Sequence, residues 1–222
     1  MQIDDTIIKD KRSASEYDLR AQETHWFGPE VIFGLIYEFL RPGDSVLDLG
    51  IGSGLSSILF HKAGLRVYGL DCSSEILEVC KSKGFTTELK QHDLRSMPLP
   101  YPSSFFDHVI AVAVLHFFRD LDQQFEGTAR IIKEQGIFAF TVEEQKPNQD
   151  DKYIINRVNV SEQPKAETAV TLFRHLDTYI IKLLNSNGFV LFKALEFLAF
   201  NYPYENKDIF WKAYIAQKKG HT

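Results

Sequence analysis

The sequence predicts an α/β fold in which helices cover both faces of a mostly parallel sheet. Short apolar runs typical of buried parallel strands recur along the chain, and stretches with helical spacing separate several of them. The first run ends in a glycine-rich turn at residues 50–54, where a strand passes into a helix. The chain has 222 residues, of which 44% are hydrophobic, so it can bury a sizeable core. We therefore expect a single domain over residues 1–222.

The segment before the first strand contains a polar terminus and a helix. Residues 1–28 are mostly polar but include the pair Tyr17-Asp18 and an aromatic cluster at 25–27. A Gly-Pro pair at 28–29 then starts a helix, whose apolar residues share one face until a Pro-Gly pair at 42–43 ends it. The aromatic residues of the terminus either attach a loose end to the body of the protein or belong to a lid.

The next elements alternate as far as residue 142. After the glycine turn a short helix is expected, and the later helices and strands are predicted at 66–71 (strand), 73–83 (helix), 86–91 (strand), 105–113 (strand), 120–133 (helix) and 136–142 (strand). Beyond residue 173, the sequence predicts a helix that opens at Arg174-His175 and stops at Asn187-Gly188. Strands at 189–197 and 209–217 complete the chain, with a loop at 201–204 between them.

An insert separates the fifth strand from the last long helix. Residues 143–173 contain no strong helical pattern. Stretches of this length inside a compact domain usually form binding loops or lids. We interpret the insert as a cover on the substrate side, with a disordered loop as the alternative.

The glycine turn follows a strand that carries a carboxylate. In the run Asp48-Leu49-Gly50-Ile51-Gly52-Ser53-Gly54 the glycines occupy alternate positions. A dinucleotide fingerprint requires G-x-G-x-x-G, but this chain has Leu55 where that pattern needs its third glycine. A carboxylate also repels a pyrophosphate and suits a cationic ligand better. The turn therefore favours a cationic nucleotide ligand over a dinucleotide.

A second carboxylate, Asp71, ends the next predicted strand. It lies about 20 residues beyond the glycines, where a carboxylate accepts hydrogen bonds from both hydroxyls of an adenosine ribose. NAD enzymes use the same device, so Asp71 supports adenosine without selecting the cofactor. The alternative role is a cap on the following helix, although Ser73 suffices for that role alone.

The glycine turn resembles motif I, D/E-x-G-x-G-x-G, of the class I S-adenosylmethionine-dependent methyltransferases. The stretch from Asp93 to Phe118 is similar to that family's D-x-x-x-L-P-F-x-x-x-x-F-D-x-V-x-x-x-x-V-L-H-H. The resemblance covers about residues 15–217 and implies a seven-stranded sheet of order 3-2-1-4-5-7-6 with the last strand antiparallel. It also implies S-adenosyl-L-methionine as cofactor and S-adenosyl-L-homocysteine as product.

The resemblance places each part of the cofactor. The methionine end is expected on the glycine turn and Ala113, with its ammonium near Asp48 or the carbonyls of the turn. Asp93 is expected to accept a hydrogen bond from the adenine amino group, and Tyr17-Asp18 stands where the family often has a lid. The whole expected cofactor-binding set is Tyr17, Asp48, Leu49, Gly50, Ile51, Gly52, Gly54, Asp71, Cys72, Ile76, His92, Asp93, Leu94, Ala113 and His116.

Catalysis of methyl transfer requires no triad, because the methyl group already sits on a good leaving group. The protein has to align the acceptor and exclude water. Where the acceptor must lose a proton, the candidate bases are His116, His175, His25 and Tyr17, which we expect to reach one cleft from different segments. The spacing of Cys72 and Cys80 suggests no metal site and no disulfide.

Composition narrows the partners. The net charge is −5, and no basic run is longer than Lys218-Lys219, so the sequence argues against a nucleic-acid partner and favours a small-molecule acceptor. An enzyme that modifies RNA or protein stays an alternative, as do an NAD-dependent oxidoreductase and a non-catalytic nucleotide-binding protein. The charged N-terminus and the lack of long apolar runs predict a cytoplasmic protein without a membrane partner. Monomer and dimer are both open.

Overall fold

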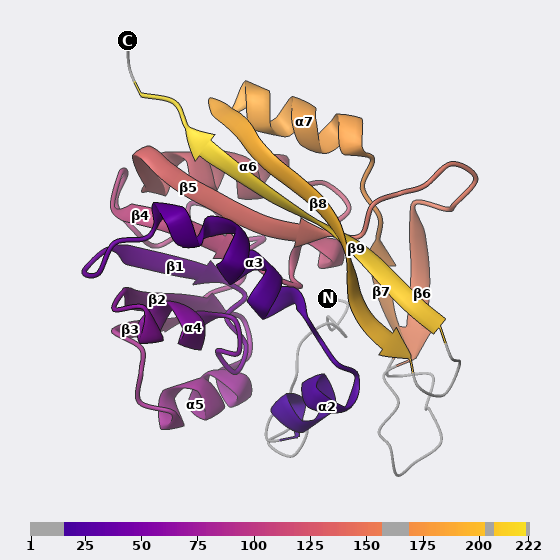
Figure 1. Cartoon of the computed structure of the whole chain (residues 1–222), viewed down its shortest axis with the longest axis horizontal. Helices are drawn as coiled ribbons and strands as arrows, with labels where there is room; N and C mark the ends of the chain where they lie inside the picture. Colours follow the sequence, from indigo (N-terminus) through magenta and orange to yellow (C-terminus); the bar gives the residue numbers. More distant parts are fainter. Residues whose placement is uncertain (1–15, 157–168, 203–206, 221–222) are drawn as a thin grey trace.

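A seven-stranded sheet runs through the computed structural model, which describes residues 16–156, 169–202 and 207–220 (Figure 1). The strand order is β3-β2-β1-β4-β5-β9-β8. The first five strands are parallel, and β9 lies antiparallel between β5 and β8. Counted within this sheet alone, the order is 3-2-1-4-5-7-6, which confirms the predicted topology. The strands are β1 (Ser45–Leu49), β2 (Arg66–Asp71), β3 (Glu88–Gln91), β4 (Phe106–Ala111), β5 (Ile132–Val142), β8 (Phe189–Tyr202) and β9 (Lys207–Lys218).

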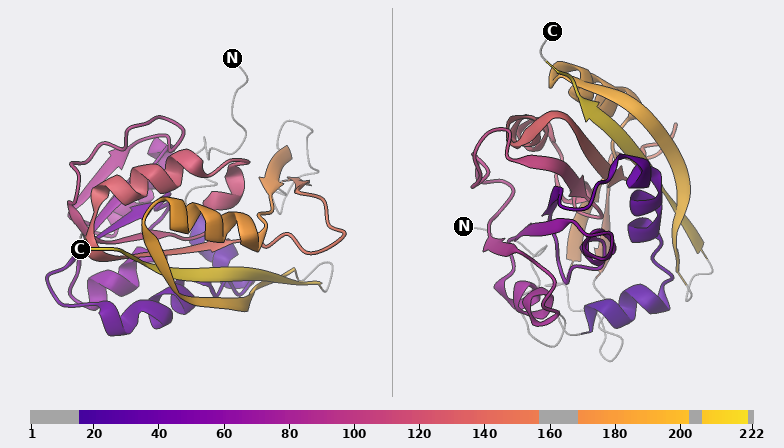
Figure 2. Two further views of the ribbon diagram at one scale, coloured as in Figure 1. Left: turned by 90° about the horizontal axis from the view of Figure 1, so that it is seen from above. Right: turned by 60° about the vertical axis from the view of Figure 1, so that its left-hand side comes forward.

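Helices cover both faces of the sheet, as predicted (Figure 2). Successive strand residues point to opposite faces, so Val46 and Leu47 of β1 belong to different core clusters. One cluster packs the sheet against α3 (Gly28–Ile36), α4 (Ser57–Lys62) and α5 (Ser74–Ser82). The other packs it against α6 (Asp122–Ile131) and α7 (Asp177–Ser186). All five residues of β1 are buried, which explains its apolar run.

Two predicted boundaries are wrong because backbone groups pair across the fold. The last helix begins at Asp177, since Arg174 N donates to Asp151 O at 2.7 Å and His175 N donates to Glu143 O at 3.0 Å. Strand β8 extends through Asn201 and Tyr202, which pair with β9, so these residues are not part of a loop. Residues 203–204 of the predicted loop lie outside the described residues.

The insert is a β-hairpin in its described part. Strands β6 (Lys152–Asn156) and β7 (Ala169–Phe173) form an antiparallel two-stranded sheet. Val170 and Leu172 are buried, and β7 contacts the 3-10 turn η2 (Leu115–Phe117) that follows β4. The disordered-loop alternative is therefore wrong for residues 143–156 and 169–173, and residues 157–168 lie outside the described residues.

The N-terminal segment is attached to the body at its second half. After α2 (Tyr17–Glu23), the chain runs beside β8: Phe27 N donates to Ala199 O at 3.0 Å, and Asn201 N donates to Thr24 O at 3.1 Å. The ring of Trp26 packs edge-on against Trp211 of β9, with 5.2 Å between centroids. Residues 24–27 are thus attached to the body of the protein, and this attachment was one of the two roles expected for the aromatic residues. Residues 1–15 lie outside the described residues.

Candidate functional site

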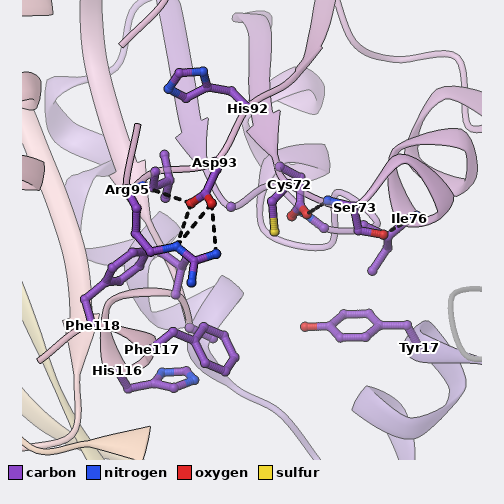
Figure 3. A pocket seen from close by; sticks show the side chains of 16 residues that line it. Tyr17, Cys72, Ser73, Ile76, His92, Asp93, Arg95, His116, Phe117 and Phe118 are labelled. Carbon is purple, nitrogen blue, oxygen red and sulfur yellow. Dashed lines mark hydrogen bonds and ion pairs between the residues drawn. The ribbon is translucent and has the colours of Figure 1, made fainter. Parts of the chain in front are cut away.

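A pocket lies at the carboxyl ends of β1 to β4, next to the point where the strand order reverses between β1 and β4 (Figure 3). In open α/β sheets this is the usual place for a ligand. Each of these strands is followed by residues that line the pocket. The complete lining is Tyr17, Gly50, Gly52, Asp71, Cys72, Ser73, Ile76, His92, Asp93, Leu94, Arg95, Ala113, Val114, His116, Phe117 and Phe118.

Most of the expected cofactor contacts line this one pocket, and the exceptions come from β1 and its turn. Four expected residues do not line the pocket, because they are buried inside the protein: Asp48 and Leu49 of β1, and Ile51 and Gly54 of the turn. The sequence motif identified the turn correctly but did not distinguish residues that face the pocket from residues that support them. Sequence analysis also missed five lining residues: Ser73, Arg95, Val114, Phe117 and Phe118.

The three glycines of the turn are required for different reasons. A Cβ on Gly50 would lie 2.5 Å from Val114, and a Cβ on Gly54 would lie 2.5 Å from Phe85. Both positions need glycine because protein side chains pack there. Gly52 has a φ of +55°, and the nearest atom to a Cβ there would be 3.7 Å away on Ile76. Among the three, Gly52 is therefore the position where open space meets bare backbone.

Asp71 holds the turn as well as lining the pocket. Its carboxylate accepts hydrogen bonds from Gly52 N and Ser73 N, both at 2.9 Å. Burial raises the pKa of Asp71 above its ordinary value, and these backbone bonds oppose that rise. Cys72 also donates to this carboxylate, through its backbone N and its thiol. The cap of α5 is Ser73, whose Oγ accepts from Ile76 N at 3.2 Å, so Asp71 is not needed for that role.

Asp48 lies under the turn instead of facing the pocket. It is 1% exposed, and Ser57 Oγ donates to its Oδ2 at 2.6 Å. Burial raises the pKa of Asp48 to about 7, and the negative charge of Asp71 adds to this effect while the Ser57 hydrogen bond opposes it. The expectation of a direct contact between Asp48 and a cationic ligand is therefore not met in this structure. Near neutral pH its carboxyl is only partly ionised.

The third carboxylate, Asp93, lines the pocket together with Arg95. Arg95 binds Asp93 through both its backbone N and its guanidinium group. Val114, Phe117 and Phe118 add apolar and aromatic side chains to the lining of the pocket. Figure 3 shows the rings of Phe117 and Phe118. The position of Arg95, two residues after Asp93, could have predicted this pair. In a turn, side chains two residues apart can reach each other.

Tyr17 lines the pocket from α2, and its neighbour Asp18 attaches this helix to the glycine turn. Asp18 accepts a hydrogen bond from Ser53 Oγ with one oxygen and forms an ion pair with Lys83 through the other. Ser53 belongs to the turn, and Lys83 caps the end of α5. The position of Tyr17 over the pocket therefore depends on a contact with the turn itself.

We expect Asp18→Asn to loosen this attachment. The variant keeps an acceptor for Ser53 but loses the negative charge that pairs with Lys83, so amide hydrogen exchange in residues 17–23 should speed up. Partly exposed pairs contribute up to ~1 kcal/mol, so the affinity for S-adenosylhomocysteine should fall by no more than about fivefold. Glu78→Gln, which removes a pair on the surface of α5, is the matched control. Unchanged exchange in α2 would show that Asp18 does not hold the helix.

Of the four candidate bases, only His116 and Tyr17 line the pocket. His116 is 5% exposed, and its ring lies 4.2 Å from Phe117 and 4.8 Å from Trp211, centroid to centroid. His175 is buried against Tyr179, where burial lowers its pKa, and His25 lies on the surface beside Phe27. The expectation that all four reach one cleft is therefore wrong for His175 and His25.

Residues 47–140 match the sequence model of the family described as "Methyltransferase domain". This match confirms the predicted resemblance to methyltransferases for residues 47–140. The matched segment runs from β1 to β5 and contains the glycine turn, Asp71 and Asp93. These are the elements that build the pocket described above.

Curated relatives and a solved structure resemble the chain in sequence or in fold. It is 30% identical over 103 residues to the uncharacterized methyltransferase YcgJ of Bacillus subtilis, covering 44% of this chain and 40% of the relative. It is 34% identical over 103 residues to demethylmenaquinone methyltransferase of Bacillus mycoides, covering 44% of each chain. The chain thus matches under half the length of these relatives. A SAM-dependent methyltransferase from Methanosarcina mazei shares the fold, with a TM-score of 0.69 at 18% identity over 84% of this chain and 98% of that one.

Two further observations concern metals and membranes. Within the described residues, no group of three or more His, Cys, Asp or Glu side chains is placed to hold a metal ion. None of the helices in the described ranges is both long and apolar enough to cross a membrane.

Proposed function

We propose that this methyltransferase domain binds S-adenosylmethionine in the pocket and transfers its methyl group to a small-molecule acceptor. The observation that carries the proposal is the pairing of Gly52 with Asp71. The open backbone of Gly52 suits close approach of the methionine end, and the Asp71 carboxylate, 2.9 Å from Gly52 N, lines the same pocket as an acceptor for ribose hydroxyls. Asp93 at the end of β3 is the matching candidate for the adenine amino group.

In this proposal the cofactor supplies a methyl group on a sulfonium, which is already activated for transfer. The work of the chain is to orient the acceptor and to exclude water. Tyr17 and α2 cover one side of the pocket, and we propose residues 16–27 as a lid. The β6–β7 hairpin supports η2, which carries His116, and we propose the insert as the acceptor-side cover. His116 is the candidate proton acceptor for an acceptor that must be deprotonated.

The lining of the pocket and the charge of the chain favour a small molecule as acceptor. Val114, Phe117 and Phe118 offer apolar and aromatic surface, and the net charge of −5 gives no attraction for a nucleic-acid backbone. The name of the Bacillus mycoides relative also specifies a small-molecule acceptor, demethylmenaquinone. A cytoplasmic location is part of the same proposal.

Titration calorimetry with S-adenosylmethionine, S-adenosylhomocysteine and NAD tests the proposal. We expect the first two to bind at micromolar concentrations, and we expect no binding of NAD, because the turn lacks the dinucleotide spacing. Binding of NAD alone would favour an oxidoreductase. A chain that binds both sulfur nucleotides but methylates no acceptor in a screen of quinols, phenols and carboxylic acids would be a binding protein.

A further inference from the structure

Arg95 occupies the acceptor positions of Asp93 in this structure. Arg95 N donates to Asp93 Oδ1 at 2.9 Å, and Arg95 Nε donates to Oδ1 at 2.9 Å and to Oδ2 at 3.1 Å. Arg95 Nη2 donates to Oδ2 at 2.8 Å. A carboxylate offers about four lone-pair positions. These four hydrogen bonds therefore use the acceptor capacity of Asp93.

The guanidinium group also lies on the pocket side of Asp93. Both residues line the pocket, and Figure 3 shows the Arg95 guanidinium directed towards Phe117. An amino group that donates to Asp93 from within the pocket must compete with this arginine. Asp71 differs in this respect, because its partners are neutral groups: the backbone amides of Gly52 and Ser73, and Cys72.

We propose that Arg95 competes with the adenine amino group of the cofactor for Asp93. The cofactor binds when Arg95 releases Asp93 and the amino group takes its place. This inference rests on the proposed function, because it requires an adenine nucleotide in the pocket. The side chains of Arg95 and Asp93 are 49% and 38% exposed, so the guanidinium can turn into water when it leaves. An exposed ion pair of this kind contributes up to ~1 kcal/mol, so the pairing of Arg95 with Asp93 reduces cofactor affinity by at most about fivefold.

Calorimetry on Arg95→Ala with S-adenosylhomocysteine tests the proposal. We expect the variant to bind this ligand about two- to fivefold tighter than the unaltered chain. Raising sodium chloride from ~50 mM to ~500 mM should strengthen binding to the unaltered chain, because salt weakens the exposed pair, and should leave the variant unaffected. Weaker or equal binding by Arg95→Ala would overturn the inference.

A ligand analogue separates competition for Asp93 from simple steric blocking. In the analogue, purine replaces adenine, so it lacks the amino group that would displace Arg95. We expect the unaltered chain and Arg95→Ala to bind this analogue equally. A gain for the variant with the analogue as large as that with S-adenosylhomocysteine would contradict exchange at Asp93.

Arg119→Ala is the matched control. Arg119 pairs with Asp151 at 2.8 Å, both side chains are about as exposed as the Arg95 pair, and neither residue lines the pocket. The control changes the net charge by the same amount and should bind S-adenosylhomocysteine as the unaltered chain does. If the unaltered chain bound no S-adenosylhomocysteine, the proposed function would fail and this inference with it. If it bound normally while Arg95→Ala behaved like Arg119→Ala, only the inference about Arg95 would fail.

Discussion

S-adenosylhomocysteine is expected to leave the melting temperature of Gly52→Val unchanged, whereas it raises the melting temperature of the unaltered chain. Gly52 is the glycine of the turn whose missing Cβ faces the open pocket, with its nearest neighbour 3.7 Å away on Ile76. A branched side chain there occupies the space that a ligand needs against the backbone. We expect an affinity loss of at least about a hundredfold, which corresponds to ~3 kcal/mol.

The strain of the substitution has to be separated from the loss of the ligand. Gly52 has a φ of +55°, so valine there costs about 1–3 kcal/mol of stability in the absence of ligand. Gly84 has a φ of +69°, has no heavy atom within 4 Å of an added Cβ, and does not line the pocket. Gly84→Val should therefore lose similar stability but keep its full response to S-adenosylhomocysteine. Should Gly52→Val still gain stability from the ligand, Gly52 would be only a turn residue.

The second large effect concerns stability and pH. Asp48→Asn should be more stable than the unaltered chain at pH 8, and this advantage should disappear near pH 4. The folded chain holds a proton on Asp48 up to about pH 7, whereas the unfolded chain releases it near its ordinary pKa of 3.8. Stability of the unaltered chain is therefore fully present below pH 4 and falls as pH rises to 7. One pKa unit corresponds to about 1.4 kcal/mol, so the fall relative to the asparagine variant is roughly 4 kcal/mol.

Urea unfolding of both chains at several pH values measures this difference, and other titrating groups cancel in the comparison. Asp107→Asn is the control of opposite sign. Burial tends to raise the pKa of Asp107, but hydrogen bonds from Lys133 and Ser45 prevail and lower it to about 2. The stability that Asp107 contributes should be present above pH 4 and be lost as pH falls towards 2. If the free energies of unfolding of Asp48→Asn and of the unaltered chain changed with pH in the same way, Asp48 would stay ionised when the chain folds.

The strands of the main sheet and the positions of Asp71 and Asp93 were predictable because their signals are local. A buried parallel strand is recognisable from its own apolar run, and a turn from its own glycines. Asp71 and Asp93 each end or follow such a strand, and the carboxyl ends of parallel strands meet at one edge of a sheet. The sequence therefore placed Gly52, Asp71 and Asp93 beside one pocket before any tertiary contact was known.

The hairpin in the insert and the start of the last helix were not predictable in the same way. Strand β7 packs against η2, which lies some 55 residues earlier in the chain. Its own residue pattern therefore did not indicate a strand. Arg174 and His175 directly precede a run of residues with helical spacing. Their backbone N–H groups nevertheless donate to Asp151 O and Glu143 O, respectively. Long-range backbone pairing decided these segments over their local propensity.

The sequence by itself determined the α/β topology and the edge of the sheet at which the pocket lies, because spacing within single elements encodes them. Only the tertiary structure decided which motif residues face the pocket. Gly50 and Gly54 are required by Val114 and Phe85, side chains from distant segments, while at Gly52 the space for a Cβ is open. Asp48 became a buried carboxyl beneath the turn because the sheet and α4 close over it. Burial depends on what packs around a residue, and that is fixed only when distant segments meet.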